Sequence, residues 1–182
     1  MGLLPLFPWK ATTNYVTSMQ IGFGWSSMTG VESALLAKEG VAGLDTVFDG
    51  EKGYDRALAE KYDPNEIIDS LGERYYILDT YMKRHPTCSL PHGMIDAILE
   101  ILSEHPLRPE DITAVDVKTV PVVYKICNKP VLEDVLSAQF SMQFLAALVI
   151  TKGQIEVEDF TREKIGDPEI SNLAKKVQVS ID

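Results

Sequence analysis

The chain has 182 residues, which is enough for one domain of ordinary size or two small ones. Its 17 Lys and Arg residues against 27 Asp and Glu residues give a net charge of −10, which argues against nucleic acid or an anionic membrane surface as a partner. The hydrophobic content of 45% is typical of a globular protein, and the two cysteines are too few for a disulfide framework. They suit a reducing compartment such as the cytoplasm, or the mitochondrion if the cell is eukaryotic.

The first third of the chain has a helical pattern with a loose start. Apolar residues fall near helical spacing within 27–38, and Gly40 is placed to end that helix. Turn-forming residues follow at 43–53, and a further short helix is predicted at 54–61, before Pro64. This part therefore predicts helices joined by a long turn.

From about residue 70 the pattern changes to alternating strands and helices. Aromatic and branched residues at 75–83 predict a strand, and Pro91 is placed to begin a helix with one apolar face. The later predicted elements are a strand at 112–120, a long buried helix at 131–151, a short helix at 168–175 capped by Asp167, and a strand at 177–181. The buried stretch at 140–150 is too short to span a bilayer. The order β-α-β-α-α-β predicts an α+β fold beside a helical piece.

The densest group of reactive side chains lies at residues 83–92, between a predicted strand and a predicted helix. Loops in this position often carry binding groups, and the N-terminus of the helix would favour an anion there. Lys83 supplies a positive charge, and His92 could donate to a carboxylate or move a proton. The alternative is that Lys83 is only solvated at a strand end and that His92 is a surface or capping residue.

The other reactive residues of this loop have simpler interpretations. We expect His85 to be structural, and Cys88 to be a small apolar residue of the loop or a thiol that lines a pocket. The sequence contains no dinucleotide fingerprint, P-loop, GxSxG or HExxH motif. The residue pattern alone thus predicts an anion-binding loop and no particular reaction.

Three stretches of the sequence resemble one known family. Residues 83–96, KRHPTCSLPHGMID, are similar to the Lys-x-x-Pro-x-Cys…His-x-x-Ile-Asp signature of the MmgE/PrpD family. Residues 31–40 and 47–54 resemble the helix and the glycine-rich loop of that family, and residues 137–141, SAQFS, resemble the start of a later helix. The joint resemblance covers about residues 10–182.

The resemblance implies a two-domain enzyme with a large helical domain and a smaller α+β lid, in a homodimer. Residues 1–68 would be the C-terminal part of the helical domain, and residues 69–182 most of the lid, incomplete at its end. It also implies that Lys83 and His92 are catalytic and that both, together with Cys88, bind substrate. The family includes 2-methylcitrate dehydratase, cis-aconitate decarboxylase and iminodisuccinate epimerase, which use no metal or organic cofactor.

The resemblance leaves two kinds of function open. One is a lyase or isomerase fragment, similar to 2-methylcitrate dehydratase, that removes a proton beside a carboxylate of a small di- or tricarboxylate. Such a chain is expected to be inactive alone and to need a partner chain that carries the missing helical half. The other is a non-catalytic truncated paralogue, which would only bind a carboxylate or dimerise.

Overall fold

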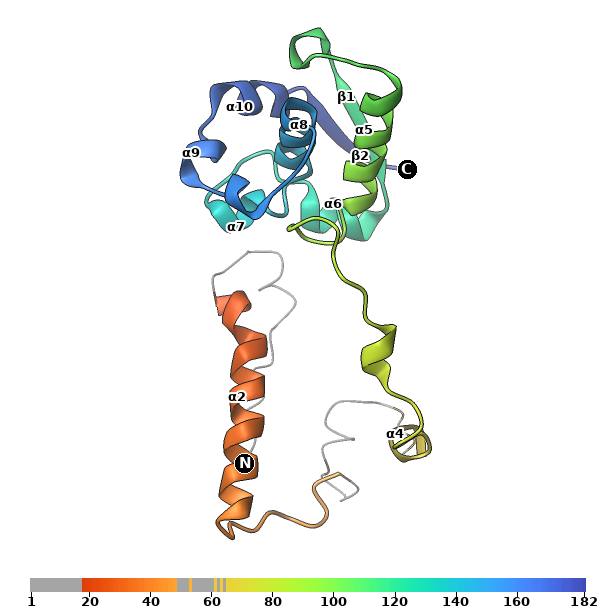
Figure 1. Cartoon of the computed structure of the whole chain (residues 1–182), viewed down its shortest axis with the longest axis vertical. Helices are drawn as coiled ribbons and strands as arrows, with labels where there is room; N and C mark the ends of the chain where they lie inside the picture. Colours follow the sequence, from red (N-terminus) through yellow and green to blue (C-terminus); the bar gives the residue numbers. More distant parts are fainter. Residues whose placement is uncertain (1–17, 49–52, 54–60, 62, 64) are drawn as a thin grey trace. The chain divides into compact units, whose positions relative to one another are not determined.

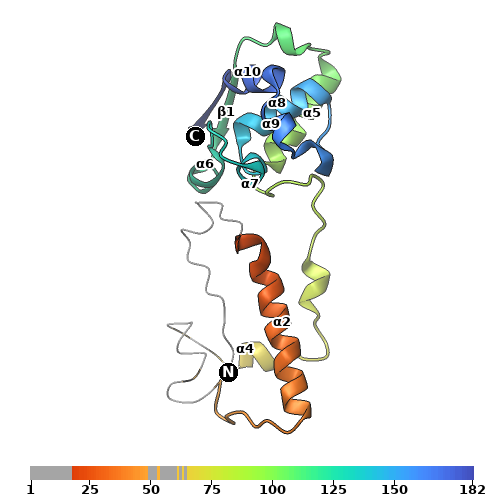
Figure 2. The same cartoon turned by 90° about the vertical axis from the view of Figure 1, so that its left-hand side faces the viewer.

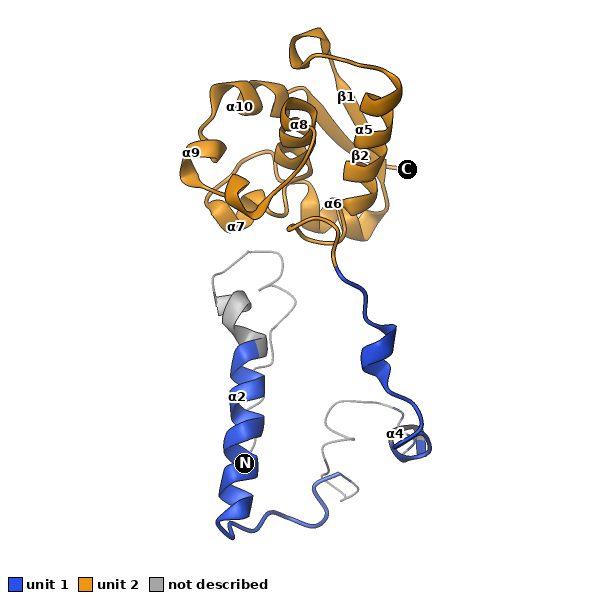
Figure 3. Ribbon diagram, viewed as in Figure 1, with its two compact units in different colours: residues 1–6, 20–82 blue, residues 7–19, 83–182 orange. Residues whose placement is uncertain are grey.

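The described residues of the computed structural model fall into two compact units (Figure 3). The described residues are 18–48, 53, 61, 63 and 65–182. Unit 1 contains the described residues between 20 and 82, and unit 2 contains residues 18, 19 and 83–182. The predicted division into domains at residue 68 stays a prediction.

Two sequence predictions fall wholly or mostly outside the described residues. These are the loose helical start before residue 18 and the short helix at 54–61. In the part of the chain that is described, no helix combines the length and the apolar character needed to cross a membrane.

The main element of unit 1 is helix α2, Ser18–Lys38. It begins earlier than the predicted helix at 27–38 and ends as predicted at Gly40, whose φ is +89°. The Gly40 N–H donates to the Ala37 carbonyl at 3.0 Å, which closes the last turn. Glycine adopts this left-handed conformation without the steric cost that a Cβ would bring, so the predicted stop has a local cause.

The predicted strand at 75–83 is wrong. The segment follows the short helix α4, Asn65–Ile68, and contains the 3₁₀ turn η1, Tyr76–Asp79, followed by extended chain. Its large side chains are exposed, Leu78 by 81%. A strand requires a neighbouring strand for its backbone groups, and the described residues provide none here.

Unit 2 contains all the other elements (Figures 1 and 2). In chain order they are α5 (His92–Glu104), η2 (Pro109–Asp111), β1 (Val115–Thr119), α6 (Pro121–Cys127), α7 (Val135–Ala138), α8 (Met142–Lys152), η3 (Val157–Asp159), α9 (Arg162–Ile165), α10 (Pro168–Ala174) and β2 (Val177–Ile181). The two strands pair in parallel, with Val115 opposite Val177 and Thr119 opposite Ile181. Unit 2 is therefore a mixed helical and β structure, in agreement with the predicted α+β class.

The core of unit 2 is built around α8. Leu145, Ala146 and Val149 are fully buried, and α5, α10 and β2 pack against this helix. A helix that is apolar on every face belongs in the middle of a core, so the predicted burial of this segment is confirmed. A second, smaller core cluster contains Cys127 and Met142. Among the residues that the structure describes, both clusters consist of residues of unit 2.

The predicted single helix at 131–151 is wrong, because two polar side chains divide it. The Asp134 carboxylate accepts from the Ser137 N–H at 2.7 Å and begins α7. The Ser141 hydroxyl accepts from the Phe144 N–H at 3.1 Å and begins α8. Short polar side chains of this kind satisfy free N–H groups at helix starts, and here they create a second start.

Candidate functional site

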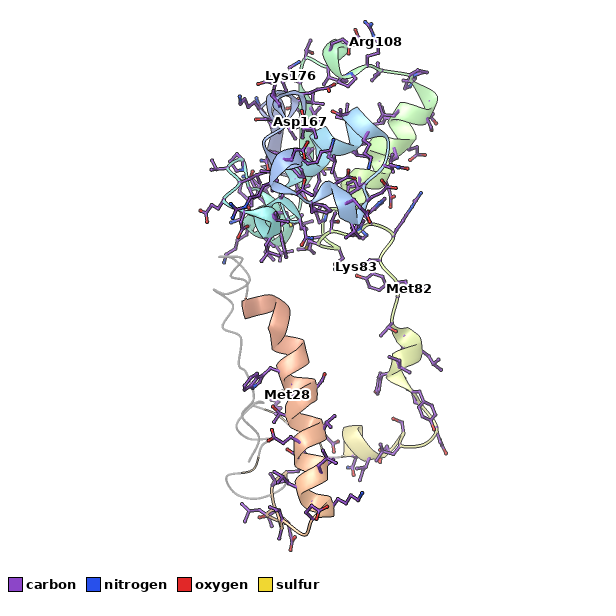
Figure 4. The ribbon with its side chains drawn as sticks, turned by 60° about the vertical axis from the view of Figure 1, so that its left-hand side comes forward. Met28, Met82, Lys83, Arg108, Asp167 and Lys176 are labelled. Carbon is purple, nitrogen blue, oxygen red and sulfur yellow. The ribbon has the colours of Figure 1, made fainter. Side chains whose placement is uncertain are left out.

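The loop at residues 83–91 and the first two turns of α5 carry the reactive side chains predicted from the sequence. Lys83 follows Met82 at the point where unit 2 begins, and both are labelled in Figure 4. The Cys88 N–H donates to the Gln139 carbonyl at 3.1 Å, and the His92 N–H donates to the Ser89 carbonyl at 3.2 Å. These backbone bonds attach the loop to unit 2 and to the start of α5.

The Asp96 carboxylate holds the first half of the loop. Its Oδ1 atom lies 3.0 Å from His85 Nε2 and 2.9 Å from Arg84 Nη1. His85 is only 6% exposed, and a carboxylate can only accept, so the His85 Nε2 atom carries the proton. This hydrogen bond and the Arg84 charge lower the pKa of Asp96. Asp96 is therefore the residue that holds His85 in place, in line with the structural role predicted for His85.

The imidazole of His92 packs edge-on against that of His85. The ring centroids lie 5.1 Å apart and the ring planes meet at 79°. Burial, and then the nearby charges of His85 and Lys83, lower the pKa of His92, although Asp96 and a hydrogen bond to the His85 backbone act in the opposite direction. The lowered pKa favours the neutral form of His92.

The Nε2 atom of His92 is buried and has no hydrogen-bond partner among the described residues. When the neutral ring carries its proton on Nδ1, Nε2 is unprotonated. A buried nitrogen with a free lone pair is the form of histidine that can accept a proton.

Lys83 brings a positive charge to the same loop. Its side chain is exposed, and one ammonium N–H donates to the Thr87 carbonyl at 3.1 Å. An ammonium group has three donors, so Lys83 can still bind an oxygen of a ligand. The Lys83 charge lowers the pKa values of both His92 and Cys88, which means that it lies near both.

Cys88 is half-buried at the middle of the loop. A hydrogen bond with the Cys127 side chain, together with the Leu90 backbone and the Lys83 charge, outweighs burial and lowers its pKa to about 6. A lowered pKa favours the thiolate, which is the reactive form of cysteine. The structure therefore brings the three predicted residues, Lys83, Cys88 and His92, together around one loop.

Comparison with known proteins agrees with the resemblance seen in the sequence. The model of the MmgE/PrpD C-terminal domain matches residues 85–182, which is more than half of the chain. The chain belongs to the MmgE/PrpD family. It is 28% identical over 163 residues to human cis-aconitate decarboxylase and 27% identical over 164 residues to the mouse protein of the same name. Each alignment covers 86% of this chain and 33% of the relative, so the chain spans about a third of the length of these curated relatives.

Two residues around this loop have no role predicted from the sequence, Arg84 in the loop and Asp96 on α5. The spacing of His92 and Asp96, four residues apart on α5, places them one turn apart on the same face and could have indicated that Asp96 lies beside the site. The contact from Asp96 back to His85 depends on how the loop folds, and no local pattern shows it.

The described residues contain no group of three or more His, Cys, Asp and Glu side chains placed to hold a metal ion. The loop and the start of α5 carry an ammonium group on Lys83, an imidazole on His92 and a thiol on Cys88. Together these can bind a carboxylate and transfer a proton.

Proposed function

We propose that the loop at 83–92 binds one carboxylate of a small di- or tricarboxylic acid and takes part in a lyase or isomerase reaction. The main observation behind this proposal is that Nε2 of His92 is buried and has no hydrogen-bond partner among the described residues, while the nearby charge of Lys83 lowers the pKa of the ring. Membership of the MmgE/PrpD family and the similarity to cis-aconitate decarboxylase support a carboxylate as the substrate. We propose 2-methylcitrate dehydratase-like chemistry as the reaction type.

The mechanism follows from what each group can do. The Lys83 ammonium binds the substrate carboxylate and stabilises the negative charge that builds on it when a neighbouring carbon loses its proton. The Nε2 atom of His92 accepts that proton and later returns it, either to a leaving hydroxyl group or to the carbon. The Asp96–His85 pair does not touch the substrate, and it positions His92 by fixing the ring against which His92 packs. Cys88 lies in the same loop, and we assign it a role in substrate binding beside Lys83 and His92.

We further propose that this loop is one side of the active site and that unit 2 acts as a lid. The curated relatives are about three times as long as the matched part of this chain, and catalysis requires all reacting groups in one geometry. Turnover is thus proposed for an assembly in which a homodimer or a partner chain supplies further groups, whereas carboxylate binding is proposed for this chain itself.

Binding to the isolated chain is the test that does not depend on a partner. Thermal unfolding is followed with citrate and with cis-aconitate, because a ligand that binds the folded state raises the unfolding temperature. Lys83→Ala is expected to weaken binding roughly tenfold, the typical loss for one hydrogen bond to a charged group. Lys118→Ala removes the same charge from an exposed site on β1 and is the matched control, with no expected effect.

The outcomes separate the two kinds of function. Equal binding by the wild type, Lys83→Ala and Lys118→Ala variants would overturn the assignment of the loop. Carboxylate binding that depends on Lys83, with no turnover of 2-methylcitrate, cis-aconitate or iminodisuccinate even beside a chain that supplies the rest of the relatives' length, would instead favour a non-catalytic binding protein.

A further inference from the structure

The two cysteines of the chain lie next to each other in unit 2, although they are far apart in the sequence. Cys88 lies in the loop before α5, and Cys127 is the last residue of α6. Cys127 is fully buried, and Cys88 packs against the cluster that contains it. The other buried members of this cluster are Val123, Ile126, Leu136 and Met142. Both thiols are free.

The surroundings of the two sulfur atoms shift their pKa values in opposite directions. A reactive pair of thiols requires one sulfur that ionises readily and a second thiol beside it. Cys88 packs against the cluster that contains Cys127, and hydrogen bonding with the Cys127 side chain is the largest cause of the lowered pKa of Cys88, to which the Lys83 charge adds. The same bond, together with burial and the negative charge of Cys88, raises the pKa of Cys127, against a small effect of Lys129 in the opposite direction. One thiol is thus half-buried with a lowered pKa, and the other is buried beside it with a raised pKa.

The backbone keeps the pair together. The Cys88 N–H is bonded to the Gln139 carbonyl at 3.1 Å, and the Cys88 carbonyl accepts from the Thr87 hydroxyl at 2.9 Å. Cys127 is fixed by the last turn of α6, where the Asn128 N–H donates to the Tyr124 carbonyl at 3.0 Å. Neither cysteine therefore needs a change of fold to remain beside the other.

We propose that Cys88 and Cys127 form a reversible disulfide when the protein meets hydrogen peroxide. The Cys88 thiolate attacks one peroxide oxygen, the O–O bond breaks, and the departing hydroxide takes up a proton to give water and a sulfenic acid on Cys88. The Cys127 sulfur then loses its proton and attacks the Cys88 sulfur, and the hydroxyl group leaves as a second molecule of water. The two thiols are oxidised by loss of two hydrogen atoms, and one peroxide is reduced to two waters.

This modification site goes beyond the proposed carboxylate chemistry and does not depend on it. Formation of the disulfide would remove the negative charge of the Cys88 thiolate next to Lys83 and would link the loop to α6. A thiol such as dithiothreitol would reverse it by exchange. The inference therefore assigns to Cys88 a reaction of its own, apart from its predicted place in substrate binding.

The test uses the purified chain, treated with hydrogen peroxide under native conditions and then unfolded in iodoacetamide. The expected result is a mass lower by two hydrogen atoms, no alkylated cysteine, and a tryptic peptide pair that joins Cys88 to Cys127. Dithiothreitol should restore both alkylation sites. Sulfinic or sulfonic acid on Cys88 with Cys127 unmodified, a disulfide between two chains, or two unchanged thiols would each overturn the proposal.

A second measurement examines the pair without oxidation. The rate at which iodoacetamide alkylates Cys88 in the native protein should rise with pH around a midpoint near 6. Cys127→Ala removes the donor, so the midpoint should move to higher pH and peroxide should give Cys88 sulfenic acid without a disulfide. An unchanged midpoint in Cys127→Ala would contradict the hydrogen bond on which the pair depends. If this variant does not fold, the peptide map of the wild type still decides.

Discussion

Replacing Asp96 by Ala tests whether this residue holds the reactive loop in place. The change leaves the His85 Nε2–H, in a side chain that is only 6% exposed, without its acceptor. A buried donor that loses its partner costs about 1 to 3 kcal/mol. The ion pair with Arg84 adds little, because both side chains are exposed, by 72% and 42%. Alanine returns about 0.5 kcal/mol of helix propensity within α5.

The expected net loss of unfolding free energy is therefore about 1.5 kcal/mol. Urea unfolding followed by circular dichroism should show the midpoint of unit 2 lowered by about 1 M at an unchanged slope. Glu100→Ala is the matched control, because Glu100 is an exposed carboxylate on the same helix, and its change should stay within about 0.5 kcal/mol. If Asp96→Ala unfolds at the same urea concentration as Glu100→Ala, the reasoning about the His85 contact is refuted.

The pH dependence gives an independent check on the same contact. Asp96 has a lowered pKa in the folded protein, so its contribution is present above its unfolded pKa of about 3.9 and is lost as the pH falls through the folded value. Asp96→Asn keeps the size of the side chain and removes the titration. The stability difference between the wild type and Asp96→Asn should thus shrink below pH 4, and a difference that stays constant would contradict the assignment.

Three other variants have direct expectations. His92 has a lowered pKa, so the wild type should lose stability as the pH falls below 6.5 and His92→Asn should lack that part of the loss; parallel curves from pH 7.5 to 5 would argue against a buried neutral ring. Leu145→Ala empties fully buried space in α8 and should cost about 3 to 4 kcal/mol in urea unfolding, whereas a cost below about 1 kcal/mol would mean that α8 is not the centre of the core. Gly153→Ala places a Cβ at φ +77° after α8 and should cost about 1 kcal/mol of unfolding free energy, and a neutral result would contradict this helix end.

The elements that the sequence predicted well are those with a strong local signal. The apolar spacing after Pro91 predicted α5, the alternating residues at 177–181 predicted β2, and Asp167 before Pro168 predicted the start of α10, where the Asp167 carboxylate accepts from the Glu169 N–H at 2.9 Å. In each case the signal and the structure have the same cause, either burial of one face or a cap.

The predictions that were wrong depended on information from outside the segment. Residues 75–83 are rich in aromatic and branched residues, but a strand also requires a partner strand, which local composition does not reveal. The helix at 131–151 was divided by Ser141, whose hydroxyl also donates to the Lys129 carbonyl at 2.6 Å. Helix α6 was missed because strand-like residues precede it, although Pro121 at its first position was a usable signal.

The candidate site was predictable to a similar extent. The cluster of Lys83, Cys88 and His92 follows from their positions in one short loop between secondary-structure elements. The contacts around these residues join the loop to other segments, His85 to Asp96 on α5 and Cys88 to the cluster that contains Cys127 on α6. Contacts of this kind arise only when the chain folds, and so the sequence alone could not supply them.

The pairing of β1 with β2 has a consequence for how the protein is made. Val115 pairs with Val177, so the two strands are separated by 177 − 115 = 62 residues, and the described residues give β1 no other strand. At a synthesis rate of about 5 to 20 residues per second, β1 waits roughly 3 to 12 seconds on the ribosome for its partner. Val115 and Val117 share a core cluster with residues of α5, which is made before β1, and of α8, which is made during the interval. We therefore expect α5 to cover the first strand initially and α8 to join it before the sheet exists.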